Sequence, residues 1–168
     1  MTPLTFLFAA SLTAITLGVI DHRSGRMPNS LTLSSLVCAL LGATAWGGFP
    51  GFLYALLGAL LVGGAPALLY FSTHGQAIGG GDIKALAALG AWLGPSLGLH
   101  AELLAFCLLA GAALLSEIKR GRPMALIKSW LLPNRSSHWG ASSPPLAARQ
   151  VRFGPYLALA TLITSVAN

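Results

Sequence analysis

The chain has 168 residues, of which 55% are hydrophobic and only 8% carry a formal charge. A typical soluble domain has about a quarter of its residues charged, so this composition excludes an ordinary water-exposed globular surface. The net charge of +6 would suit a nucleic-acid partner, but no aromatic residues interleave with the basic loop as base stacking requires, so we expect no nucleic acid. The composition predicts an all-α protein whose solvent is the lipid bilayer.

Apolar windows along the chain predict a polytopic bundle of about six transmembrane helices. The windows cover residues 3–20, 31–48, 51–71, 83–99, 101–118 and 154–167. The first window lacks a basic start and a small-residue cleavage signal, so we interpret it as a retained helix rather than a signal peptide. Residues 1–168 are then expected to form a single membrane-embedded domain.

The basic residues predict the orientation of these helices. If the helices alternate in direction, the loops at residues 21–30, 72–84 and 119–153 share one side of the membrane, and all ten lysines and arginines fall in them. The opposite turns, near Trp46–Gly51 and Gly94–His100, contain none. The positive-inside rule then places the three loops in the cytoplasm and both termini outside. The last of these loops also carries a basic amphipathic segment, which we expect on the membrane surface.

Several residues inside the windows have structural interpretations. Cys38 and Cys107 lie in apolar stretches without a C-x-x-C pair, so we interpret them as small buried hydrophobic residues. The histidines are isolated, and a metal site needs three or four converging ligands, so we predict no metal. Gly90 and Gly94 form a G-x-x-x-G pattern that allows close helix packing. Pro66 is expected to bend its helix because it lacks a backbone donor.

The chain has only four carboxylates, and ionisable groups at membrane depth are costly and usually functional. We expect Glu102 to begin the fifth helix, where its charge suits the positive end of the helix dipole, and Glu117 to pair with neighbouring basic residues. Asp21 closes the first helix as it reaches the cytoplasm, and Asp82 opens the fourth helix as it leaves. The two aspartates therefore share a side and a depth, and antiparallel neighbouring helices can bring them face to face.

A facing pair of carboxylates can hydrolyse a peptide bond without a metal or a covalent intermediate. Like charges at close range cannot both ionise, so one group keeps a proton while the other remains a base. One carboxylate then takes a proton from water, and the other donates a proton to the substrate carbonyl oxygen. The structural alternative is that Asp82 caps its helix and Asp21 pairs with Arg23. The chemistry of these residues alone leaves both interpretations open.

The residues around Asp82 favour the functional interpretation. Gly79, Gly80 and Gly81 directly precede it, and glycine permits positive φ and the close approach of another backbone. An extended substrate can then lie beside the carboxylate; a simple helix-breaking turn is the alternative. A G-x-x-x-x-G-K-[ST] phosphate loop is absent from the sequence. Lys84 is expected to hold the charge of Asp82, to contact the substrate, or to extend to the lipid headgroups.

Three separated motifs resemble those of the type IV prepilin peptidases. The stretch Gly79–Gly94, GGGDIKALAALGAWLG, resembles the G-x-G-D signature of that family. The turn Asp21–Thr32, DHRSGRMPNSLT, resembles the family's first aspartate followed by a hydrophobic residue, proline and asparagine, here with Pro28 and Asn29. Asn29 is also expected to cap the second helix. The segment Arg152–Tyr156, RFGPY, resembles the family's final F-G-P-Y motif.

The resemblance implies an aspartic endopeptidase of the bacterial inner membrane, with Asp21 and Asp82 as its catalytic pair. Its substrate partner would be a prepilin-like membrane protein whose short basic leader is removed on the cytoplasmic side. Larger members carry an N-terminal region with C-x-x-C motifs and methylate the new N-terminus. Neither feature has a counterpart in this sequence, so we expect peptidase activity only, without zinc, S-adenosylmethionine or another cofactor, as in the short members that serve tight-adherence (Flp) pili.

Two functions from other classes remain open at the level of sequence. A small proton- or cation-coupled transporter would use intramembrane aspartates as a proton relay or a cation site. A non-catalytic subunit of a pilus or secretion assembly would keep the fold without cleaving a peptide. The sequence predicts no oligomeric state.

Overall fold

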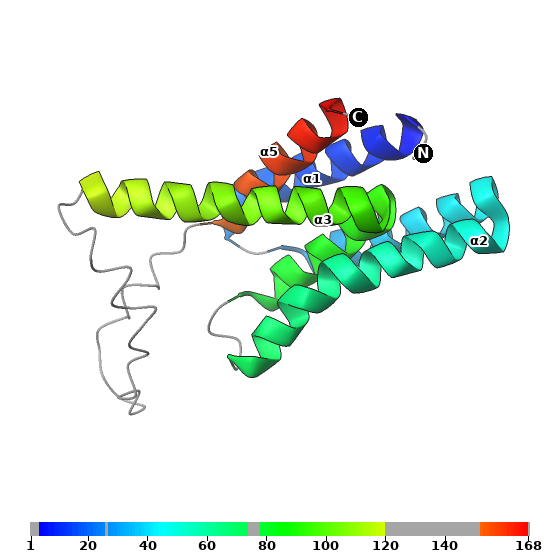
Figure 1. Cartoon of the computed structure of the whole chain (residues 1–168), viewed down its shortest axis with the longest axis horizontal. Helices are drawn as coiled ribbons and strands as arrows, with labels where there is room; N and C mark the ends of the chain where they lie inside the picture. The colour runs from blue at the N-terminus through cyan, green and yellow to red at the C-terminus, as the bar shows by residue number, and fades with distance from the viewer. Residues whose placement is uncertain (1–3, 26, 74–77, 120–151, 168) are drawn as a thin grey trace. The chain divides into compact units, whose positions relative to one another are not determined.

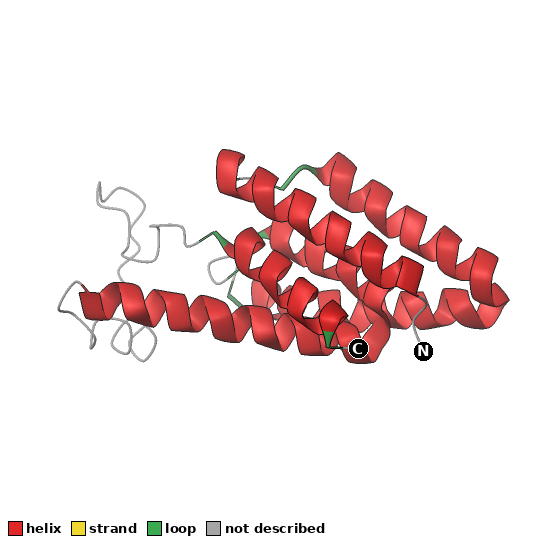
Figure 2. Cartoon of the chain, turned by 90° about the horizontal axis from the view of Figure 1, so that it is seen from above, coloured by secondary structure: helices red, strands yellow, loops and turns green. Residues whose placement is uncertain are grey.

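The computed structural model describes residues 4–25, 27–73, 78–119 and 152–167 (Figure 1). Four helices make up most of these residues: α1 (Leu4–Ser24), α2 (Asn29–Ser72), α3 (Gly80–Lys119) and α5 (Phe153–Val166). Within the described ranges the remaining residues form short connections and no strand, as Figure 2 shows. The predicted all-α class is confirmed. Residues 120–151, which hold most of the predicted basic loop and its amphipathic segment, lie outside the described residues.

The chain divides into two compact units. The first consists of Met1–Phe106 and Arg152–Asn168, and it contains α1, α2, the first part of α3 and α5. The second consists of Cys107–Val151, whose described part is the helical C-terminal end of α3. Asp21, Asp82 and Glu102 all lie in the first unit.

Helix α2 consists of two helical segments joined at Gly48, whose φ of 60° and ψ of −151° are not helical. Glycine adopts such a conformation without the steric cost that a side chain would bring. Pro50 is well suited to the first turn of the second segment, where a backbone N–H has no helical partner. Gly51 lies against the backbone of Ala43, although eight residues of straight helix would separate them by about 12 Å. The chain therefore folds back on itself at Gly48 (Figure 1).

Helix α3 is interrupted in the same way at Gly94, where φ is 76° and ψ is 178°. Pro95 follows directly, and its ring disfavours the α conformation for the residue before it. A Cβ atom built on Gly98 would lie 3.3 Å from the Cα of Gly90, so the chain folds back here too. The two interruptions fall within the turns predicted at Trp46–Gly51 and Gly94–His100.

The two glycines of the predicted G-x-x-x-G pattern both lie against α2. Gly90 packs so closely against Gly58 of α2 that a Cβ atom at either position would meet the backbone of the other. This contact is the close approach that small residues permit in membrane helices. Gly94 also lies against α2, since a Cβ atom on Gly58 would lie 3.0 Å from the carbonyl carbon of Gly94, and it forms the reversal of α3 as well. Both glycines therefore permit the close helix packing that the pattern predicts.

Two predictions about the apolar windows are wrong. The reversal between the fourth and fifth windows lies at Gly94, the first residue of the predicted turn Gly94–His100, because Pro95 ends the first segment. Glu102 therefore does not begin a helix; it lies about two turns inside the second segment and is only 6% exposed. Cys38 and Cys107 are exposed rather than buried, which is tolerable at a lipid-facing surface because lipid chains are as apolar as these side chains.

Helix α5 packs along α1 (Figure 1). Gly18 permits this contact, since a Cβ atom there would lie 3.0 Å from both the Cβ of Ala158 and the carbonyl oxygen of Gly154. Toward the other end of the pair, the Ser11 hydroxyl donates a hydrogen bond to the Ser165 hydroxyl at 3.2 Å. Side-chain hydroxyls of this kind join helices where lipid offers no other partner.

The surface of the helices is strongly apolar. Leu4, Phe8 and Leu68 are 83%, 72% and 74% exposed, respectively, whereas the fully buried positions include Leu17 and Leu86. By length and composition, three helical stretches among the described residues are suited to cross a membrane. These are Leu4–Ser24, Asn29–Ser72 and Gly80–Ser116, and Phe153–Val166 is a shorter apolar helix.

Candidate active site

Asp21 lies in the last turn of α1, and its side chain is only 6% exposed. The helix ends three residues later because Gly25 adopts a φ of 65°, which leaves the right-handed helical region. The Gly25 N–H still donates to the Asp21 carbonyl oxygen at 2.8 Å. Asp21 is therefore fixed within the final turn, while the adjacent His22 is exposed.

The first turn of α5 supplies a hydrogen-bond donor to Asp21. The backbone N–H of Gly154 donates to Asp21 Oδ2 at 3.0 Å, across 133 residues of sequence. The first N–H groups of a helix have no partner within it and form the positive end of the helix dipole, so a carboxylate is stabilised there. A Cβ atom on Gly154 would lie 2.7 Å from the Cβ of Asp21. Glycine is therefore required for this contact by the space available.

Asp82 lies in the first turn of α3 and is bound by the glycine that precedes the helix. The Asp82 N–H donates to the Gly79 carbonyl oxygen at 3.1 Å, and the Gly79 backbone N–H bonds the Asp82 carboxylate in return. This reciprocal arrangement resembles a capping box. The structural alternative of a capping role is thus present at Asp82, and it also fixes the position of the carboxylate.

The three glycines before Asp82 provide space rather than positive φ. None of Gly79, Gly80 and Gly81 is among the glycines with positive φ, so that part of the prediction is wrong. A Cβ atom on Gly79 would lie 3.1 Å from Asp82 Oδ2, and one on Gly81 would lie 3.3 Å from the Cβ of Met27. A Cβ atom on Gly80 would meet nothing within 4 Å. The chain is tightly packed on either side of Gly80 and open at Gly80 itself.

Asp21, near the end of α1, and Asp82, at the start of α3, lie within range of electrostatic interaction with each other. The charge of Asp21 acts on the Asp82 carboxyl group, and such an interaction falls with distance and is weak unless the groups are close. Each carboxylate also accepts a hydrogen bond from a glycine N–H at the start of a helix, Gly154 for the first and Gly79 for the second. Two acidic groups in this arrangement can hold and exchange a proton beside a bound water molecule.

Lys84 and Asn29 form a hydrogen bond that links α3 to α2. The Lys84 Nζ donates to Asn29 Oδ1 at 2.9 Å. Asn29 therefore does not cap its helix: Pro28 occupies the N-cap position with a φ of −69° and a ψ of 126°, and no side chain caps the helix. Of the three roles expected for Lys84, its observed contact is with the Pro28–Asn29 turn. The segments carrying the two predicted motifs are thus tied together beside the aspartates.

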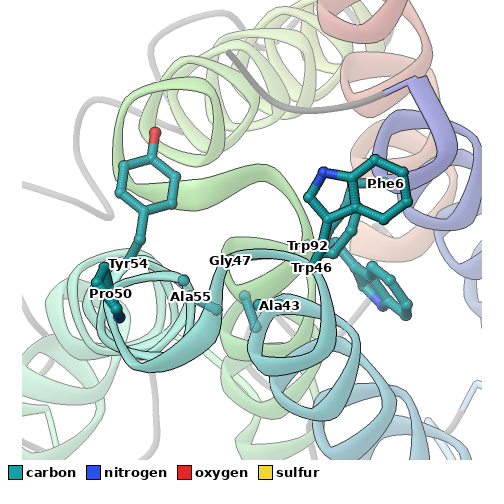
Figure 3. Close-up of a pocket in the computed structure, with 10 residues that line it drawn as sticks. Phe6, Ala43, Trp46, Gly47, Pro50, Tyr54, Ala55 and Trp92 are labelled. Carbon is teal, nitrogen blue, oxygen red and sulfur yellow. The ribbon is translucent and has the colours of Figure 1, made fainter.

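A separate cavity of about 370 Å³ lies far from the aspartates. It is lined by residues of α1, α2 and α3, including Phe6, Trp46, Tyr54 and Trp92 (Figure 3). Phe6 is 15 residues before Asp21 on the same helix, which corresponds to about 22 Å. Of the residues that the structure describes, no carboxylate lines this cavity, and it is not part of the candidate active site. Among the described residues no group of three or more histidine, cysteine, aspartate or glutamate side chains could hold a metal ion.

Two residues with a bearing on the site were missed in the sequence. The F-G-P-Y segment resembles a family motif, but nothing in its sequence indicates that Gly154 contacts Asp21. The available signal is a glycine in the first turn of an apolar helix. Backbone N–H groups there have no partner within the helix, and glycine has no side chain to cover them. The sequence predicts Glu102 at a helix start, but it is buried inside a helix.

The described residues form apolar helices suited to cross a membrane, and two aspartates at helix ends lie within electrostatic range of each other. These features define an integral membrane protein with a site for acid–base chemistry. Residues 6–115 match the type IV leader peptidase family. This match covers more than half of the chain and includes both aspartates, so the chain belongs to that family, whose members are prepilin-type peptidases. Helix α5 lies beyond the matched residues. No curated protein and no solved structure matches the chain.

Proposed function

We propose that this chain is an aspartic endopeptidase that removes the basic leader of prepilin-like proteins at the cytoplasmic face of the bacterial inner membrane. The observation that carries the proposal is the pairing of Asp21 with Asp82, each bound by a glycine N–H and each within electrostatic reach of the other. Membership in the type IV leader peptidase family supports the class of reaction and of substrate. The two aspartates are the proposed catalytic residues.

The folding back of α2 and α3 supports six membrane crossings. Each of these helices has two segments, and α1 and α5 contribute one segment each. If every segment crosses once, the connections after Ser24, Ser72 and Lys119 share one side with both aspartates. All ten lysines and arginines lie in or beside these connections, which favours the cytoplasm for that side and the outside for both termini.

The proposed reaction adds water directly to the scissile peptide bond. The ionised carboxylate takes a proton from the water molecule, whose oxygen attacks the carbonyl carbon, while the protonated carboxyl group donates its proton to the carbonyl oxygen. The tetrahedral intermediate then collapses, the C–N bond breaks, and the leaving amine takes up a proton from the carboxyl group that received it. The products are a leader with a new carboxylate and an apolar protein with a new amino terminus.

The open backbone at Gly80 supports a binding mode for an extended substrate. No atom lies within 4 Å of a Cβ position at Gly80, in contrast to Gly79 and Gly81. A substrate segment can therefore lie against this glycine, two residues from Asp82. The leader of the substrate is basic and stays in the cytoplasm, and its apolar helix stays in the membrane. The peptide bond between the two parts would then reach the aspartates at the membrane surface.

We also infer that the chain acts as one peptidase domain, with residues 119–153 as a basic cytoplasmic loop that anchors on the membrane surface. The proposed chemistry uses water and two carboxyl groups, and it requires no metal, S-adenosylmethionine or other cofactor. Cleavage without N-methylation, as in the tight-adherence peptidases that the sequence resembles, is part of the proposal.

The proposal is tested with purified protein and a membrane protein that has a basic leader, a glycine and an apolar helix of about 20 residues. Wild-type protein should release the leader, and mass spectrometry should locate a single cut at the leader boundary. Asp21→Asn and Asp82→Asn keep the side-chain volume and should each reduce the rate at least about 100-fold. His22→Ala is the matched control, because His22 is exposed next to Asp21, and it should cleave like wild type.

The same assay separates the rival functions. Normal cleavage by either asparagine variant would overturn the assignment of the catalytic pair. A wild-type protein that releases no leader but moves protons or cations across liposomes, in a manner dependent on Asp21 and Asp82, would favour the transporter. A protein that does neither would favour the assembly subunit.

A further inference from the structure

Glu102 is a buried carboxyl group that the proposed mechanism does not use. It lies in the second segment of α3, and its side chain is only 6% exposed. Within the described part of the chain, no hydrogen bond or ion pair reaches this carboxyl group. An ionisable side chain inside a membrane protein is costly and usually marks a functional position. Helix packing does not explain Glu102, whereas a ligand that pairs with its carboxyl group would.

The depth of Glu102 follows from two independent contacts. Gly98 lies against Gly90 across the α3 reversal. In an antiparallel pair, the residue four positions after Gly98 lies opposite the residue four positions before Gly90, so Glu102 lies opposite Leu86. Leu86 is one helical turn farther from the start of α3 than Asp82. On the same helix, Phe106 contacts Phe153 at the start of α5, with ring centroids 5.3 Å apart. Glu102 is one turn before Phe106, which corresponds to about 6 Å along the axis. Both routes place Glu102 about one helical turn farther into the bundle than the aspartates.

The side chain of Glu102 is buried, but its carboxyl oxygens keep some accessible surface. Every fully inaccessible side-chain oxygen or nitrogen among the described residues has a hydrogen-bond partner. The Glu102 oxygens have none, so they must retain some accessible surface. A ligand group that donates hydrogen bonds can therefore approach them.

The proposed substrate presents suitable donors at this depth. Its apolar helix begins just after the scissile bond, and the first four N–H groups of a helix have no partner within the helix. These groups also form the positive end of the helix dipole, which favours a neighbouring carboxylate. In an apolar environment an unsatisfied N–H group is costly, so it needs an acceptor from the protein. A carboxyl group one turn deeper than the cutting site meets this requirement.

We propose that Glu102 binds the N-terminal end of the substrate's apolar helix, with its carboxyl oxygens accepting hydrogen bonds from the backbone N–H groups of the first turn. This inference rests on the proposed peptidase function and adds a substrate-binding residue to it. The contact fixes where the helix begins, and therefore which peptide bond lies beside Asp21 and Asp82. Because backbone N–H groups occur in every sequence, Glu102 recognises the start of a helix rather than a particular side chain.

Binding of uncleaved substrate tests this role. In the Asp82→Asn background, Glu102→Leu removes both oxygen acceptors, so the dissociation constant for the leader-bearing protein should rise about 10- to 100-fold. Glu102→Gln keeps one carbonyl acceptor, and its dissociation constant should remain within about 5-fold of the parent. Thermal unfolding of Glu102→Leu should occur at or above the parent temperature, because it buries an apolar side chain. Equal affinity of the leucine variant and the parent would overturn the inference.

A cross-linking experiment locates the contact. Cys38 and Cys107 are exposed and are first replaced by alanine. Glu102→Cys should then form a disulfide with a cysteine in the first turn after the cleavage site of the substrate, and not with one three turns farther along. Equal cross-linking at both positions would contradict the inference. Leader cleavage by protein with Glu102 intact is measured in parallel. If that protein does not cleave, the proposed peptidase function is wrong. If it cleaves normally but Glu102→Leu binds the substrate as tightly as the parent, only the role of Glu102 is wrong.

Discussion

Glycines serve different purposes at the two ends of the helices. At the aspartate end, Gly79 and Gly154 have negative φ and are needed for their N–H groups and for the space beside a carboxylate. At the other end, Gly48 and Gly94 have positive φ and reverse the chain. The first kind positions chemistry and the second kind sets the architecture. Substitutions at the two ends should therefore affect different measurements.

The largest expected effect is at Gly94. Gly94→Ala forces a side chain into a φ of 76° and into contact with the ring of Tyr54. Backbone strain and overpacking each cost about 1–3 kcal/mol, so we expect the variant to lose several kcal/mol of stability or to fail to fold. Thermal unfolding in detergent measures the effect. Unfolding at the wild-type temperature would contradict the assigned backbone conformation.

Gly154→Ala should mainly reduce catalysis. The added methyl group collides with Asp21, and displacing a catalytic group by about 1 Å can cost about 100-fold in rate. Gly18→Ala is the matched control, because it crowds the same α1–α5 contact at 3.0 Å without touching the carboxylate. Leader cleavage is measured at saturating substrate for both variants. An equal loss in the two variants would mean that helix packing, and not the position of Asp21, explains the effect.

Two adjacent glycines at the α2 reversal test whether a positive φ, rather than space, is what requires glycine there. Gly48→Ala introduces a side chain at positive φ without a close contact, so we expect a loss of about 1–3 kcal/mol. Gly47→Ala lies in the helical segment with nothing within 4 Å of its Cβ position, and it should gain about 0.5–1 kcal/mol. Thermal unfolding of the two variants should therefore shift in opposite directions. Shifts of the same sign would refute the distinction.

The smallest expected effect is at the Lys84–Asn29 hydrogen bond. Both residues are exposed, so Lys84→Met or Asn29→Ala should cost no more than about 1 kcal/mol in stability and only a few-fold in cleavage rate. The double variant should lose no more than either single variant, because both remove the same contact. Full additivity in the cleavage assay would show that the two residues act separately.

Hydropathy and charge predicted much of the fold because apolar length and turn residues are local properties. The reversals at Gly48 and Gly94 lie within the predicted turns, and Asp21 and Asp82 were selected for their shared depth. Contacts between distant segments were not predictable in this way. The Gly154 N–H that binds Asp21 is backbone, and the burial of Glu102, about two turns past the reversal at Gly94, depends on how distant segments pack.

The central claim is that Asp21 and Asp82 lie together at one end of the bundle, and cysteine cross-linking tests it most directly. In protein with Cys38 and Cys107 replaced by alanine, Asp21→Cys combined with Asp82→Cys should form an intramolecular cross-link rapidly with a short bifunctional reagent. The control pair combines Asp21→Cys with Trp46→Cys, an exposed position at the other end, and should react far more slowly. Equal rates for the two pairs, or no cross-link between positions 21 and 82, would contradict the account.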